Sequence, residues 1–201
     1  GVYIWGSSPT LVNLTISENV AGYYAGGGIY IREAAPTLTN LTISGNSAHY
    51  GGGIYMEEAD PILTNLTISE NVAGYYGGGI YIDYNCYATL ENLTIYGNAA
   101  ADGGGGVYTR DSNPTFISSI ILGNSADSGN SFNSYDEGSV PTVIYSNVED
   151  LSSMAFSSGA GNIENDPLFD NPDNGDFSLQ ENSPCIGTGL GGVDMGAHQS
   201  G

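Results

Sequence analysis

The chain has 201 residues and a formal net charge of −20, because 22 acidic side chains face only two basic ones, Arg32 and Arg110. Such a charge excludes nucleic acid and anionic membrane surfaces as natural partners, since both repel an acidic protein. No apolar run is long enough to span a bilayer, so we expect no membrane insertion. The chain starts within a repeat, and we therefore expect it to be a fragment or mature piece of a longer one.

Two strings of residues recur about every 26 residues as far as Asn124. One is Leu38-Thr-Asn-Leu-Thr-Ile-Ser-Gly-Asn46, and the other is Gly51-Gly-Gly-Ile-Tyr-Met56. The leucine spacing also matches a leucine-rich repeat, but that fold often returns through a helix, and the return segment here has three glycines, a β-type run and a proline. We therefore predict an all-β, right-handed parallel β-helix of about six to seven coils, with three short strands per coil.

Strand alternation predicts which side chains leave the core. In the first strand of a coil Ile29 and Ile31 point inward, so Tyr30 points outward. The same position on neighbouring coils forms an expected outward tyrosine column: Tyr3, Tyr30, Tyr55, Tyr81, Tyr108 and, in a degraded coil, Phe132.

Asparagine marks two corners of each coil. Leu38 and Leu41 both need the core although they are three residues apart, which predicts a tight bend at Asn40. Stacked coils then give one column of Asn13, Asn40, Asn65 and Asn92. A second column is expected at the next corner: Asn19, Asn46, Asn71, Asn98, Asn124 and Asn147.

The chain divides into residues 1–147, the coils, and residues 148–201, the last coil and an irregular capping segment. Terminal units of solenoids seal the open end of the core. The expected plug is Phe169, Phe177, Leu179 and Ile186. Cys86 and Cys185 are expected to lie several coils apart, too far for a disulfide.

The coil strings resemble the β-helical repeats of bacterial surface proteins, including the polymorphic outer-membrane-protein type. The tail strings Asp166-Pro-Leu-Phe, Gly175-Asp-Phe-Ser-Leu, Ser183-Pro-Cys-Ile and Asp194-Met-Gly-Ala resemble the closing segment of secreted β-helix proteins that end in sorting anchors. The resemblance implies an extracellular or cell-surface location. It implies no single activity, because a fold does not fix a function.

The tyrosine column is the first candidate site. Tyr30, Tyr55, Tyr81 and Tyr108 would form a flat aromatic strip that binds sugar rings. The alternative is that these rings only stabilise neighbouring strands by stacking. Tyr23, Tyr50 and Tyr75 precede the glycines and are expected to widen the strip; Tyr24 and Tyr76 belong to the same group.

A charged row beside this strip is the second candidate site. Arg32, Glu57, Asp83 and Arg110 point outward on successive coils and are expected to form exposed ion pairs, Arg32 with Glu57 and Asp83 with Arg110, each of little energetic value. If the protein is an enzyme, these four residues would serve a polysaccharide lyase or glycoside hydrolase, with Glu57 and Asp83 as the carboxylate pair.

Two further patterns suggest ligands. Calcium is the only cofactor considered, either at Glu33, Glu58 and Asp60 or at Asp170, Asp173 and Asp176, although Pro172 to Gly175 is an ordinary turn sequence. The outward threonine column would suit ice binding if it were flat and exposed; it comprises Thr15, Thr42, Thr67 and Thr94.

The sequence thus favours a non-catalytic, extracellular structural or adhesive module. Its expected partners are an extracellular polysaccharide held along the tyrosine strip, or further subunits stacked end to end. The strand edges of the first coil are unpaired, and we expect them to be covered either by upstream coils of a longer chain or by another subunit. The polysaccharide lyase or glycoside hydrolase is the alternative, and ice binding is a minor one.

Overall fold

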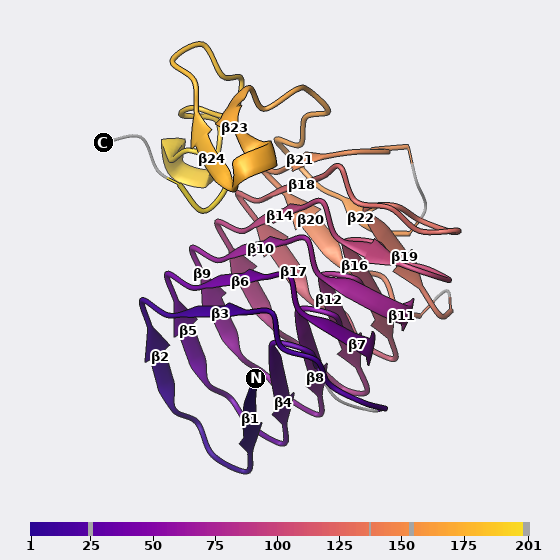
Figure 1. The fold of residues 1–201 in the computed structure, drawn as a ribbon. Coiled ribbons are helices and arrows are strands. Elements are labelled where there is room, and N and C mark those ends of the chain that lie inside the picture. The colour runs from indigo at the N-terminus through magenta and orange to yellow at the C-terminus, as the bar shows by residue number, and fades with distance from the viewer. Residues whose placement is uncertain (24–25, 137, 153–154, 199–201) are drawn as a thin grey trace.

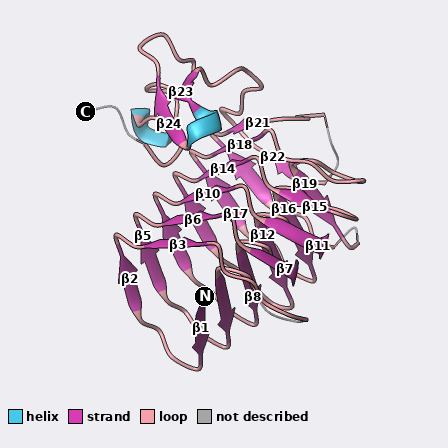
Figure 2. Cartoon of the chain, in the orientation of Figure 1, coloured by secondary structure: helices cyan, strands magenta, loops and turns pink. Residues whose placement is uncertain are grey.

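The computed structural model describes residues 1–23, 26–136, 138–152 and 155–198. The chain winds into a stack of coils whose strands pair in parallel with the coils before and after, as Figure 1 shows. In Figure 2 strands and loops make up the coils, and the helical segments found in the described ranges, the 3-10 turns Pro172–Asn174 and Leu190–Gly192, lie in the tail. The predicted right-handed β-helix is confirmed. In the described part of the chain no helix is long and apolar enough to cross a membrane.

Three long sheets form the walls of the coils. The first sheet contains β1 (Val2–Trp5), β4 (Ile29–Arg32), β8 (Ile54–Glu57), β12 (Ile80–Asp83), β16 (Val107–Arg110) and β19 (Phe132–Ser134). The second sheet contains β2 (Thr10–Val12), β5 (Thr37–Thr39), β9 (Ile62–Thr64), β13 (Thr89–Glu91), β17 (Thr115–Ile117), β20 (Thr142–Ile144) and β22 (Ser157–Ser158). The third sheet contains β3 (Thr15–Ser17), β6 (Thr42–Ser44), β10 (Thr67–Ser69), β14 (Thr94–Tyr96), β18 (Ile120–Leu122) and β21 (Asn147–Val148).

A fourth, short sheet was not expected. It contains β7 (Ser47–Tyr50), β11 (Val72–Tyr76) and β15 (Ala99–Ala100), and it follows the third sheet before the chain returns to the first. The return passes through the glycine triplets. Gly77 has a φ of +70°, which side chains rarely adopt, and a Cβ on Gly79 would lie 2.7 Å from the Gly106 carbonyl oxygen. The triplets therefore let neighbouring coils approach closely at this corner.

The core lies between the walls and is filled by the inward side chains that strand alternation predicts. Ile29, Ile31, Leu38, Leu41 and Ile43 are all at most 1% exposed. The bend predicted at Asn40 is present, because the asparagine at that corner has a φ of +55°, and Asn13, Asn65, Asn92 and Ser118 share that backbone conformation. Asparagine tolerates this left-handed conformation better than most residues.

The second asparagine column forms a buried ladder. The Asn71 side-chain amide donates to Asn98 Oδ1 at 2.9 Å, and Asn71 Oδ1 accepts from the Asn46 amide at the same distance. The ladder extends from Asn19 to Asn124. Its predicted extension to Asn147 is wrong, because Asn147 pairs with Ile120 in the third sheet and so occupies an outward strand position instead of the corner.

The degraded coil has a different register from the one predicted. Phe132 pairs with Val107, and Asn133 pairs with Tyr108. Phe132 therefore does not continue the tyrosine column but points into the core, where its ring lies 5.2 Å from that of Phe116. The error arose because Ser131 replaces the last glycine of the triplet, which hid the true alignment.

The tail does not plug the core as predicted. It packs on the outer surface of the third sheet, where Phe169, Phe177 and Met195 form a cluster with Ile120 and with Tyr96. Leu179 lies against the same cluster, whereas Ile186 is only partly buried. Figure 1 shows β23 (Phe169–Asn171) and β24 (Asp176–Leu179) beside β14 and β18.

The residue that closes the core is Phe156. It belongs to the main core cluster, and its ring lies 5.0 Å from that of Phe132. The tail packs on the third sheet instead of on the open end of the core because the outward side of this sheet becomes apolar at Ile120 and Leu122. Covering this side buries more apolar surface of the tail. Cys86 and Cys185 are free and buried, so the expected absence of a disulfide is confirmed.

Candidate functional site

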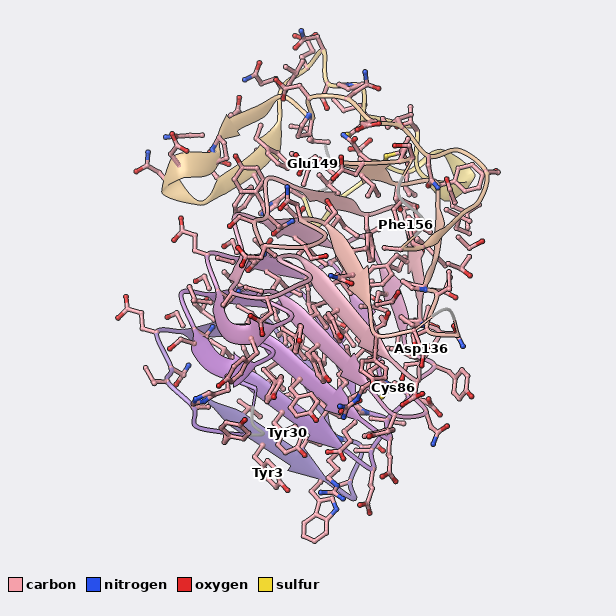
Figure 3. All side chains as sticks on the ribbon, turned by 90° about the vertical axis from the view of Figure 1, so that its right-hand side faces the viewer. Tyr3, Tyr30, Cys86, Asp136, Glu149 and Phe156 are labelled. Atoms are coloured by element: carbon pink, nitrogen blue, oxygen red, sulfur yellow. The ribbon has the colours of Figure 1, made fainter. Side chains whose placement is uncertain are left out.

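The candidate residues meet in a groove between the outward side of the first sheet and the short fourth sheet. The cavity has a volume of about 490 Å³. Its lining contains Tyr30, Arg32, Tyr50, Tyr55, Glu57, Tyr81, Asp83, Tyr84 and Arg110. The structure thus brings three of the four predicted binding tyrosines, Tyr30, Tyr55 and Tyr81, together with the whole charged row, whereas Tyr108 does not line the groove. Figure 3 shows Tyr3 and Tyr30 next to each other toward the first coil, with Phe156 toward the opposite end.

The tyrosine column is outward but not exposed, which corrects the expectation of a flat open strip. Tyr30, Tyr55, Tyr81 and Tyr108 are between 3% and 8% exposed, and only Tyr3, on the first coil, is open to solvent at 61%. Tyr50 and Tyr76, which belong to the fourth sheet, pack against this cluster of four tyrosines. This packing explains the burial, because the Tyr50 ring lies 5.5 Å from that of Tyr81, and the Tyr76 ring lies 4.4 Å from that of Tyr108.

The rings of the column stack along the coils. Tyr30 and Tyr55 lie 5.0 Å apart at an interplanar angle of 17°, and Tyr81 and Tyr108 lie 5.3 Å apart at 6°. Tyr55 and Tyr81 instead meet edge to face. Contacts of this kind stabilise packed aromatic pairs, so the stack also serves the fold. The groove therefore offers a ligand the hydroxyl groups and ring edges of the column more than its ring faces.

The carboxylates of the row accept hydrogen bonds from the tyrosine hydroxyls. Tyr30 donates to Glu57 Oε2 at 2.7 Å, and Tyr55 donates to Asp83 Oδ2 at 2.9 Å. The Tyr81 hydroxyl has no hydrogen-bond partner among the described residues. Glu57 keeps 17% of its side chain exposed, so it remains accessible from the groove.

The two predicted ion pairs differ from each other. Arg110 donates from Nε and from its terminal nitrogen to the two oxygens of Asp83, each at 2.6 Å, and the Asp83 side chain is only 1% exposed. This bidentate pair is thus buried instead of exposed as expected. Arg32 lies 3.2 Å from Glu33 and 3.9 Å from Glu57, and 40% of its side chain is open to solvent.

Burial shifts the ionisation of the groove. Desolvation raises the pKa of Tyr30, Tyr55 and Tyr81 well above the usual tyrosine value, and the negative charges of Glu57 and Asp83 raise it further. Desolvation raises the pKa of Tyr108 to about 12. These phenols are therefore neutral hydrogen-bond donors at physiological pH. They are poor proton acceptors there, because they would have to ionise first.

The chemistry of the groove suits binding better than proton transfer. Both oxygens of Asp83 are engaged by Arg110, and one of them also accepts from Tyr55, so this carboxylate has little capacity left for a substrate. Of the predicted pair, only Glu57 has a side chain that is partly exposed. Glycoside hydrolysis needs two available carboxyl groups.

Two lining residues add to the predicted set. Tyr84 was missed, and its ring lies 4.4 Å from the Arg110 guanidinium carbon. The sequence did contain a signal for Tyr84 as a lining residue, because Tyr84 directly follows Asp83 of the charged row. Tyr50 was expected only to widen the strip, but it forms the opposite wall of the groove.

The predicted threonine face is half covered. Thr15 and Thr42 are exposed, but Thr67 and Thr94 are buried under the tail, where the Ala197 amide donates to Thr94 Oγ1 at 3.0 Å. A long, flat and open threonine surface is therefore absent from the described third sheet.

For metals, no group of three or more His, Cys, Asp or Glu side chains in the described ranges is placed to hold an ion. Glu33 and Glu58 occupy equivalent corners with positive φ. Asp60 Oδ1 accepts from the Tyr87 amide, and Asp176 Oδ1 accepts from the Ser178 amide. Asp173 lies in the 3-10 turn, and Asp170 is exposed in β23. A calcium site at either place stays a prediction.

Comparison with protein-family models gives a match over most of the chain. A family model described as "Right handed beta helix region" matches residues 1–183. No curated protein and no solved structure matches the chain.

Proposed function

The chain belongs to the right-handed β-helix family, and from this premise we propose that it is a non-catalytic extracellular binding module of a bacterial surface, which holds part of a glycan in the groove. The carrying observation is that the groove collects phenol, carboxylate and guanidinium groups beside tyrosine walls. Sugar hydroxyls are both donors and acceptors, and such a mixture pairs with them. The β-helix family includes both structural and enzymatic members, so the proposal depends on this site.

The charge of the groove favours a neutral glycan. Arg32, Glu57, Asp83 and Arg110 balance one another there, whereas the remainder of the chain is strongly acidic. An acidic polysaccharide would be repelled by the field of the whole protein. It would also find Arg110 already engaged by Asp83.

A polysaccharide lyase or glycoside hydrolase at the same four residues is the rival function. A lyase must neutralise an acidic sugar, and a hydrolase needs a free carboxylate pair. The bidentate contact between Arg110 and Asp83 consumes one cation and one carboxylate that these reactions require.

A glycan array followed by a reducing-end assay tests the proposal. We expect binding of a neutral glycan without release of new reducing ends. Glu57→Gln should weaken binding about tenfold, because a groove acceptor loses its charge. Glu58→Gln is the matched control, since it makes the same change on the neighbouring residue, which is not part of the groove lining, and it should leave binding unchanged.

Three results would contradict the proposal. Cleavage of any bound glycan would establish the enzyme instead. Equal effects of Glu57→Gln and Glu58→Gln would place the ligand elsewhere. Absence of binding to all neutral and acidic glycans would remove the binding function altogether.

End-to-end assembly is a second proposal, carried by the first coil. Its strands β1, β2 and β3 lie at the edges of their sheets, and Trp5, Val12 and Val20 are exposed there. Unpaired strand edges are templates for pairing. Sedimentation should show concentration-dependent oligomers that Val12→Lys abolishes; a wild-type monomer at all concentrations would sink this proposal.

A further inference from the structure

The fourth sheet carries a second group of aromatic rings on the outer side of the groove wall. It arises from a β-bulge. Ala73 pairs with Ala48 and Tyr76 pairs with Tyr50, so the two residues between Ala73 and Tyr76 face only His49. A bulge re-aims a side chain, and here the additional residue is Tyr75.

The first coil repeats this arrangement on the other side of His49. Tyr23 follows Val20 at the same interval at which Tyr75 follows Val72, and Val20 and Val72 both pair with Ser47. The Tyr23 ring lies 4.7 Å from the His49 ring, and the Tyr75 ring lies 5.7 Å from it, stacked at 28°. Three rings from successive coils thus form one row, which we call the outer ledge: Tyr23, His49 and Tyr75.

The outer ledge is exposed, unlike the tyrosine column. Tyr23 is 55% exposed and Tyr75 is 37% exposed. A hollow of about 300 Å³ adjoins it, with His49 and Gly74 in its lining. The remaining lining residues are small or apolar: Ala21, Ser47, Ala48 and Val72. There is room for a side chain at Gly74, because a Cβ there would meet only ordinary contacts, the nearest at 3.7 Å.

Tyr50 connects the outer ledge to the groove. It lines the groove, and its ring lies 5.8 Å from that of Tyr23 and 5.4 Å from that of Tyr75. A chain of sugar units leaving the groove past Tyr50 therefore meets exposed rings next. The apolar face of a pyranose ring packs against an aromatic side chain, and the imidazole of His49 offers a polar partner for its hydroxyls.

We propose that the outer ledge is a second sugar subsite, which takes a pyranose unit of the same glycan after it passes over Tyr50. This inference rests on the proposed glycan-binding function of the groove. It assigns the ledge one occupant, a neutral sugar with an apolar face. The hollow beside His49 and Gly74 accommodates the substituents of that sugar.

Oligosaccharides of increasing length, cut from the glycan that the wild type binds, test the ledge by calorimetry. Short ones should fill only the groove and bind the wild type and Tyr75→Ala equally. Long ones should bind Tyr75→Ala about tenfold more weakly than they bind the wild type, because one stacking contact is lost. Gly74→Leu, which fills the hollow, should cause a similar loss. Tyr87→Ala is the control, because Tyr87 is 62% exposed and lies on neither surface.

The outcomes separate this inference from the groove proposal. If Glu57→Gln weakens binding of oligosaccharides of every length, but Tyr75→Ala and Gly74→Leu weaken binding of none, the subsite proposed at the outer ledge is wrong and the proposed binding in the groove is supported. If Tyr75→Ala weakens short and long ligands equally, the ledge is not a separate subsite. If no glycan binds the wild type, both proposals fail. Circular dichroism of each variant confirms that it has folded.

Discussion

The substitution Asp83→Asn tests whether Asp83 in the charged row stabilises the fold or takes part in catalysis. Asp83 is 1% exposed on its side chain and accepts two hydrogen bonds from Arg110 and one from Tyr55. The substitution keeps the shape but removes the charge, which leaves the guanidinium without its counter-ion. Breaking a fully buried ion pair costs about 3–5 kcal/mol.

The expected cost here is lower, because 28% of the Arg110 side chain reaches water. We predict a loss of about 2–3 kcal/mol in the free energy of unfolding, or roughly 4–12 °C in Tm for a chain of this size. Urea denaturation followed by circular dichroism measures it. The exposed Arg32→Gln serves as control and should change stability little.

The opposite outcome is informative as well. Catalytic residues are often destabilising, so an enzyme that used Asp83 would gain stability or stay unchanged when it is replaced. An Asp83→Asn midpoint at or above that of Arg32→Gln would therefore refute the structural role of the pair.

Two further predictions concern stability. Burial raises the pKa of the column tyrosines in the folded state, so their contribution to stability is complete below the unfolded pKa near 10 and is lost as pH rises through the folded pKa values. The free energy of unfolding should therefore decrease above about pH 10, and it should decrease less steeply in Tyr81→Phe. A free energy of unfolding that stays constant up to about pH 12 would contradict this. Asn71→Ala should lower the free energy of unfolding by about 2–4 kcal/mol, because it leaves buried hydrogen-bonding groups without partners on both sides of the ladder. Asn65→Ala, at the outer corner, should lower it by only about 1 kcal/mol. Equal losses in thermal or urea melts would show that the buried ladder stabilises the fold no more than the outer column does.

The regular coils were predictable because two local rules determine them. Strand alternation placed Ile29 and Ile31 in the core, and the three-residue interval between Leu38 and Leu41 required the bend at Asn40. These signals lie within one coil and repeat in the next, so each copy supports the others.

Features that depend on contacts between distant segments were not predictable in the same way. The burial of Tyr81 depends on Tyr50, which reaches it from another sheet. The covering of Thr94 depends on a tail residue more than a hundred positions away, Ala197. No periodic pattern encodes such contacts.

One missed feature did leave a signal in the sequence. The corner asparagines Asn13 and Asn40 are 27 residues apart, but Asn40 and Asn65 are only 25 apart. The shorter coil is the one that carries His49, and the mismatch with its longer neighbours is what produces the bulge at Tyr75. An uneven repeat length thus indicates where the strand register between neighbouring coils of a solenoid shifts.

The most direct test of the account is a crystal structure of the chain with the neutral glycan that it binds. We predict intact sugar units in the groove, hydrogen-bonded to Glu57 and packed between Tyr50 and Tyr84. A glycan bound outside the groove, or one cleaved beside Asp83, would contradict the central claim.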